Sequence, residues 1–134
     1  MLKVYTDAAV NGNPGQAGIG IVVMGDGVYE QIAKPLDGLW DNHLAEFEAI
    51  KYAMEWLIRN KHNNQLVFLY SDSKSATDAL IEGSSKNKKY MRYLRSIYLL
   101  EESFEYISLD WTSEKNNHGA DHQAKQALQM ALKS

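Results

Sequence analysis

The stretch LKVYTDAAVNGNPGQAGIGIVVM, residues 2–24, indicates how the fold begins. Residues 2–7 alternate between apolar and polar side chains, and residues 18–24 are rich in β-branched side chains, which is typical of strands. Residues 11–15, NGNPG, are all turn formers. The next segment, VYEQIAKP over residues 28–35, alternates again before a proline ends it. The sequence therefore predicts three antiparallel strands that are joined by short turns.

The remainder of the chain predicts alternating helices and strands. Helical spacing of apolar residues is present over residues 42–60, 74–83, 88–102 and 124–133, and strand patterns are present over residues 66–72 and 106–111. Residues 66–72, LVFLYSD, form a continuous apolar run, as a buried strand should. A three-stranded meander followed by strand and helix alternation predicts an α/β fold, with a mixed sheet that is flanked by helices.

Composition limits the class of protein. The chain has 134 residues, 45% of them hydrophobic, and no cysteine. A chain of this length fits one domain, residues 1–134, that buries about two thirds of its unfolded surface. No leader-like segment and no run of about 18 apolar residues is present. We therefore expect a soluble cytoplasmic protein that does not bind membranes.

Charge is concentrated in one segment. The net charge of −3 argues against a uniformly basic surface for nucleic-acid binding. However, KNKKYMRYLR over residues 86–95 contains five basic residues and no acid. Two interpretations are open: a solvated helix face, which is the more common outcome, or a local nucleic-acid-binding face.

Two acidic side chains are predicted to point inward from helices. At about 100° per residue, Glu46 falls in line with Ile50, whereas Glu48 lies on another side and is expected to face solvent. The same rotation aligns Asp121 with Ala124 on the last helix. An acid on a core-facing side is costly unless a cation meets it. Glu46 and Asp121 are therefore candidate functional residues.

Two further acids end predicted strands. Asp7 follows the first strand and Asp72 closes the apolar strand. Ligand crevices form at the carboxyl ends of strands in open sheets. The structural alternatives are a turn cap for Asp7 and a helix N-cap for Asp72. Few basic residues lie near the four acids in the sequence, and an oxygen-only cluster of this kind suits a hard divalent cation such as Mg²⁺.

Four motifs resemble one known family. TDAAVNGNPGQAGIG resembles the opening hairpin of type 1 ribonuclease H, and NHLAEF resembles the start of its glutamate-bearing helix. LVFLYSDS resembles the second aspartate strand of that family, and NHGAD resembles its final Asn-x-x-Ala-Asp motif. The motifs occur in the family's order over almost the whole chain, and each carries one of the four acids.

The resemblance implies both a fold and an activity. The fold is the ribonuclease H-like five-stranded mixed sheet, three antiparallel strands and then parallel strands, with helices on both faces. The activity is that of a metal-dependent endonuclease, a hydrolase that cuts the RNA strand of RNA/DNA hybrids by a two-metal-ion mechanism. Asp7, Glu46, Asp72 and Asp121 would be catalytic and would bind two Mg²⁺ or Mn²⁺ ions, with Asp7 between them.

The resemblance also implies substrate contacts for a protein that we expect to be monomeric. The residues expected to touch the RNA strand are Asn11, Gly12, Asn13, Gly15 and Asn42. The asparagines would recognise the 2′-hydroxyl group, which distinguishes RNA from DNA. Lys88, Lys89 and Arg92 would hold the DNA strand, with Tyr90 and Tyr93 as packing surfaces beside them.

Two of the sequence's departures from the family bear directly on the site. Many relatives carry a histidine on a loop before the last helix, and WTSEKNNHGAD has none in the equivalent part. His118 lies three residues before Asp121 and is a candidate substitute, although an exposed helix-start histidine is the commoner role. Asp41 stands where a phosphate-contacting threonine often sits, so we expect weaker phosphate affinity.

Two other functions stay open. One is a nucleic-acid-binding paralogue with weak or no cleavage activity. The other is a small-ligand protein built on GQAGIG, residues 15–20, but this glycine run enters a strand and not a helix, so it lacks the context of a dinucleotide site.

Overall fold

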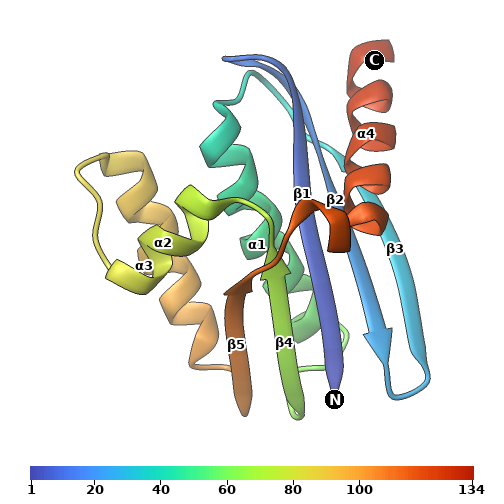
Figure 1. Ribbon diagram of the computed structural model, residues 1–134, viewed down its shortest axis with the longest axis vertical. Helices are drawn as coiled ribbons and strands as arrows, with labels where there is room; N and C mark the ends of the chain where they lie inside the picture. The colour runs from blue at the N-terminus through green and yellow to red at the C-terminus, as the bar shows by residue number, and fades with distance from the viewer.

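One five-stranded mixed sheet organises the chain, and the computed structural model describes all 134 residues (Figure 1). The strands are β1 (Leu2–Gly12), β2 (Gly15–Gly25), β3 (Val28–Pro35), β4 (Leu66–Ser71) and β5 (Tyr106–Trp111), in the spatial order β3-β2-β1-β4-β5. β1, β2 and β3 pair antiparallel, whereas β4 is parallel to β1 and β5 is parallel to β4. The predicted fold class is confirmed.

Helices cover both faces of the sheet. They are α1 (Asn42–Arg59), α2 (Lys74–Glu82), α3 (Lys88–Glu101) and α4 (His118–Lys133), with a 3₁₀ turn, η1 (Glu114–Asn116), before α4. α4 lies against β1, β2 and β3, while α1 packs on the other face together with α2 and α3 (Figure 1). None of the helices combines the length and the apolar character needed to cross a bilayer.

The last helix begins at His118, so it extends beyond the apolar repeat of residues 124–133 and includes both Asp121 and His118, in agreement with the helical positions expected for these two residues. The amide of Asp121 already donates to the carbonyl oxygen of Asn117 at 3.0 Å, so the first turn is helical. That turn is polar, so the apolar repeat alone marks only the later part of the helix.

β2 separates two different packing environments. Ile21 and Val23 belong to the hydrophobic core, which also contains Phe47 and Ile50 of α1. Gly20, which alternates with these residues, faces α4, and a Cβ atom placed there would lie 2.2 Å from the carbonyl oxygen of Ala120. Since side chains alternate across a strand, the sequence GIGIVV builds a bulky face toward α1 and a close backbone contact toward α4.

Two hydrogen bonds between tyrosines and carboxylates join α1 to α3. The Tyr93 hydroxyl donates to Glu48 at 2.7 Å, and the Tyr90 hydroxyl donates to Asp41 at 3.2 Å. The prediction that Glu48 faces solvent is therefore wrong, because α3 packs on that side of α1 and leaves Glu48 half-buried. Tyr90 and Tyr93 are also not free surfaces, since both are partly buried and their hydroxyls are engaged by α1.

Candidate active site

The register of β1 and β4 places two aspartates side by side. Their parallel pairing ends at Thr6 and Ser71, so Asp7 and Asp72 are the next residue on each chain segment. Asp7 is not at the end of its own strand, as the sequence predicted, because β1 continues to Gly12 in its hairpin with β2. The carboxyl end of β4 is nevertheless where both side chains lie, which is the location expected for a ligand crevice.

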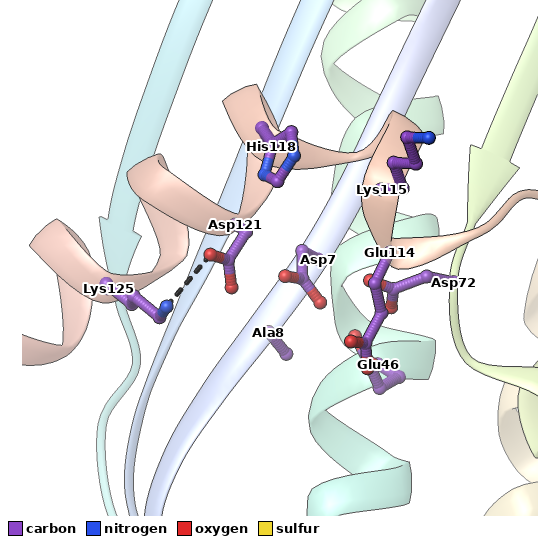
Figure 2. Close-up of a pocket in the computed structure, with 9 residues that line it drawn as sticks. All are labelled: Asp7, Ala8, Glu46, Asp72, Glu114, Lys115, His118, Asp121 and Lys125. Atoms are coloured by element: carbon purple, nitrogen blue, oxygen red, sulfur yellow. Dashed lines mark ion pairs between the residues drawn. The ribbon is translucent and has the colours of Figure 1, made fainter.

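A third carboxylate reaches the same place from α1. Carboxylate oxygens of Asp7, Glu46 and Asp72 all lie within 4.8 Å of one another. Asp121, in the first turn of α4, lies across Asp7 from Glu46 (Figure 2). The four acids open into one pocket of about 560 Å³. Its lining residues are Asp7, Ala8, Glu46, Asp72, Glu114, Lys115, His118, Asp121 and Lys125.

The carboxylates in this pocket are poorly compensated. Burial, and then the charge of Asp72, raises the pKa of Asp7 to about 8. Burial also raises the pKa of Glu46 well above its usual range, with further contributions from the charges of Asp7 and Asp72. The Glu46 Oε1 atom is buried and has no hydrogen-bond partner in the protein. Three converging oxygen ligands, one of them without a partner, fit a hard divalent cation.

Neither structural alternative for the two aspartates is correct. The N-cap of α2 is Ser73, whose hydroxyl accepts from the amide of Ala76 at 3.2 Å, so Asp72 is not the cap. Asp7 pairs with Gly20 inside the β1–β2 ladder and is not in the turn. Both carboxylates are thus free for a role in the pocket.

Asn117 supports the site and was not identified from the sequence. It is 1% exposed, and its Nδ2 atom donates to the carbonyl oxygen of Thr6 at 2.9 Å. Burial raises the pKa of Asp72, and the neighbouring Asn117 side chain offsets part of that rise. The signal was present, because Asn117 is the first residue of the NHGAD motif, but its contact with β1 depends on tertiary packing.

Two lysines also line the pocket, which the sequence analysis missed. Lys115 lies on η1, and Lys125 on α4 places its Nζ atom 2.9 Å from Asp121 Oδ2. The four-residue spacing of Asp121 and Lys125 could have indicated this ion pair, because residues four apart on a helix are neighbours. The expectation that cations are scarce around the acids is therefore wrong for one side of the site.

His118 lies at the mouth of the same pocket. It is the first residue of α4, is exposed, and lines the pocket close to Asp121 (Figure 2). This position fits a role in proton transfer or product release as well as an exposed helix-start histidine.

The predicted RNA-contacting residues meet where the β1–β2 turn reaches the start of α1. Asn13 Oδ1 accepts a hydrogen bond from the amide of Asn42 at 3.1 Å. Gly15 and Trp40 exchange two backbone hydrogen bonds, of 3.0 and 2.7 Å. Asn11, Gly12, Asn13 and Asn42 are exposed, whereas Gly15 is buried.

Asp41, next to this junction, has a structural role as the N-cap of α1. Its Oδ1 atom caps α1 by accepting from the amides of His43 and Leu44, at 2.7 and 3.1 Å, and it also accepts from Tyr90. An acid can therefore hold the helix start where the family often has threonine, because aspartate is a good N-cap.

The basic residues of α3 form an exposed row. Lys88, Lys89 and Arg92 are exposed, and no acid forms an ion pair with them. Lys89 and Arg92 also line a second pocket, of about 330 Å³, together with residues 37–40. We refer to Lys88, Lys89, Arg92 and Arg95 of α3, together with Lys86 two residues before the helix, as the basic face of α3.

Comparisons with known proteins identify relatives. A family model described as reverse transcriptase-like matches residues 5–127. A protein of Enterococcus faecalis, provisionally named hydrolase EbsB, is 42% identical over 129 residues, which cover 96% of this chain and 95% of that protein. Ribonuclease H of Caldanaerobacter subterraneus subsp. tengcongensis is 32% identical over 96 residues, which cover 72% of this chain and 60% of that enzyme.

Solved structures agree with these relatives. RNase H1 of the halophilic archaeon Halobacterium salinarum superimposes with a TM-score of 0.87 at 27% identity, covering 97% of this chain and 98% of that one. LC11-RNase H1, solved in complex with an RNA/DNA hybrid, gives a TM-score of 0.85 at 25% identity, covering 98% and 99%. The chain belongs to the reverse transcriptase-like family and is a ribonuclease H homologue, as the resemblance of its four motifs to type 1 ribonuclease H predicted.

Proposed function

We propose that residues 1–134 act as a single-domain, metal-dependent endonuclease that hydrolyses the RNA strand of RNA/DNA hybrids. The observation that carries this proposal is the convergence of Asp7, Glu46 and Asp72 within 4.8 Å, with Glu46 Oε1 buried and unpartnered. The relatives named ribonuclease H and the hybrid bound to LC11-RNase H1 support the substrate class.

The proposed metal ligands are carboxylates from three different layers of the fold. Asp7, Glu46 and Asp72 would hold one divalent ion, Mg²⁺ or Mn²⁺, and Asp7 with Asp121 would hold a second. When bound, such ions neutralise charge on the scissile phosphate, activate a water molecule and stabilise the departing 3′-oxygen. Asp7 is only 5% exposed and lies between Asp121 on one side and Glu46 on the other (Figure 2), so it would contribute to both ions.

The remaining groups would bind and orient the hybrid. Asn13 and Asn42 are held together at the surface and present hydrogen-bonding groups to a 2′-hydroxyl. The basic face of α3 has no acidic partners and is free to contact phosphates of the DNA strand. His118, which is exposed and lines the pocket, would exchange a proton with solvent or assist product release.

A cleavage assay with four substrates tests the proposal. An end-labelled RNA/DNA hybrid, an RNA duplex, a DNA duplex and single-stranded RNA are each incubated with the protein in Mg²⁺, Mn²⁺ or EDTA. We expect endonucleolytic cuts in the RNA strand of the hybrid alone, and none in EDTA. Equal cleavage of the DNA duplex would overturn the substrate class. Hybrid binding without cleavage in either metal would support the nucleic-acid-binding paralogue.

A further inference from the structure

Five acids line the pocket, namely the four predicted ones and Glu114, and among them only Asp121 forms an ion pair. Asp121 Oδ2 lies 2.9 Å from the Nζ atom of Lys125, one helical turn later on α4 (Figure 2). Asp7, Glu46 and Asp72 form no ion pair with any lysine or arginine. The pocket therefore contains a three-carboxylate group without a cation and, beside it, a carboxylate that already has one.

Lys125 belongs to the pocket and is not simply a surface residue of α4. It is one of the nine lining residues, and its side chain extends toward Asp121 and the pocket (Figure 2). The hydrogen bond from Lys125 to Asp121 raises the pKa of the lysine, and the charges of Asp7 and Glu114 add to that rise. The Lys125 side chain is 70% exposed, so it can also turn out into solvent.

An ammonium group and a divalent ion compete for the same carboxylate. A divalent ion that binds Asp121 must either displace Lys125 from Oδ2 or bind close to a positive charge, and both lower its affinity. At the three-carboxylate group no ammonium group has to leave, and a divalent ion that binds there displaces only the protons that burial favours on Asp7 and Glu46. The two positions should consequently fill at different metal concentrations.

We propose that Lys125 is an internal competitor for the metal ion at Asp121 and makes the two metal positions unequal. The position formed by Asp7, Glu46 and Asp72 fills first, and the position that uses Asp121 fills only when Lys125 is displaced. Lys125 thus acts on metal binding through Asp121 and has no contact with the reacting atoms. This role rests on the proposed function in one respect, namely that the four acids bind divalent ions.

Calorimetric titration of substrate-free protein with Mn²⁺ tests this role. The variants are Lys125→Met, which keeps the side-chain length without the charge, and Lys125→Arg, which keeps the charge. Lys115→Met is the matched control, because it removes a charge from the same pocket without freeing an acid. Circular dichroism and melting temperature check that each variant is folded.

We expect wild type to bind one ion tightly and a second weakly. Lys125→Met should tighten the second position by about two- to tenfold, while the first position changes less. Lys125→Arg should behave as wild type, and Lys115→Met should leave the difference between the positions in place.

Two results would overturn the role of Lys125. An unchanged second position in Lys125→Met would make the ion pair a contact that only stabilises the helix, and an equal gain in Lys115→Met would reduce the effect to general pocket charge. If no protein binds Mn²⁺ at all, both the competitor role and the proposed metal-dependent function fail. Binding at the first position with no effect of Lys125 leaves the proposed function intact.

Discussion

The side chain of Asn117 donates a 2.9 Å hydrogen bond to the carbonyl oxygen of Thr6, which fixes the start of α4 to β1 one residue before Asp7. Because Asn117 is 1% exposed, Asn117→Ala would leave a buried carbonyl oxygen without its partner and should cost about 1–3 kcal/mol of unfolding free energy. Hybrid cleavage should fall as well, since the variant removes a neighbour of Asp72. Urea unfolding and cleavage rates measure the two effects; unchanged stability would show that the hydrogen bond is not a structural link.

Asp72→Asn should abolish metal binding and cleavage together while the fold survives. Asparagine keeps the size of the side chain but removes one ligand charge, and catalysis should fall at least about 100-fold because the bound metal contributes several kcal/mol. In metal-free buffer the melting temperature should stay equal or rise, as repulsion with Asp7 is relieved. Calorimetry with Mg²⁺, hybrid cleavage and thermal unfolding are the measurements. A variant that cleaves at the wild-type rate would contradict the proposed mechanism.

Metal-free protein should lose stability as the pH rises from about 5 to about 8.5. Burial and the charge of Asp72 raise the pKa of Asp7 from 3.8 to about 8, so the folded state favours the protonated acid. A folded-state pKa above the unfolded value contributes stability that is complete below the unfolded pKa and is lost as the pH passes the folded pKa. Melting temperatures in EDTA across this range measure the loss.

Asp7→Asn is the control for that pH dependence, because it removes one titrating group and should make the loss of stability smaller, while the raised pKa values of Glu46 and Asp72 leave part of the dependence in place. Adding Mg²⁺ to wild type should also reverse the loss at high pH, since a bound cation stabilises the charged carboxylates. A wild-type profile with the same slope as that of Asp7→Asn would assign the dependence to other groups.

Neutralising Lys88, Lys89 and Arg92 together should raise KM for the hybrid and leave kcat nearly unchanged. These side chains are exposed and lie outside the acidic pocket, so they would contribute binding and not chemistry. The salt dependence of binding should weaken by up to about 0.9 in slope for each DNA phosphate that the variant no longer neutralises.

An equal loss of charge at Lys3, Lys61 and Lys133, which lie outside the basic face of α3, is the matched control. If the control triple changes KM and the salt slope as much as the α3 triple does, the basic face is a solvated helix surface with no special role.

His118→Ala should slow steady-state turnover more than a single turnover. The residue lies at the pocket mouth, where it would act on product release. Rapid-quench and steady-state cleavage of the same hybrid separate the two regimes. Wild-type rates in both would leave His118 as an exposed histidine at a helix start.

Local patterns were sufficient to locate the strands and helices, because each element carries its own periodicity, whereas the five-stranded arrangement of the sheet followed from the resemblance to ribonuclease H. The helical spacing of about 100° per residue also predicted correctly that Glu46 points inward, on the side of buried residues such as Ile50. What failed depends on contacts between distant segments. Glu48 faces α3, β1 continues past Asp7 because β2 pairs with it, and Asn117 contacts Thr6 across 111 positions of the chain. No local pattern encodes which helix covers which side of another.

The close backbone contact at Gly20 has a consequence for the spacing of the site. Asp7 lies in the sheet and Asp121 lies on α4, so the gap between them depends on how near that helix can come to the strands. At Gly20, which pairs with Asp7, a single methyl group would collide with the carbonyl oxygen of Ala120, the residue before Asp121. The distance between Asp7 and Asp121 across the acidic pocket therefore depends on the absence of a side chain at Gly20, a residue that contributes no chemical group to the pocket.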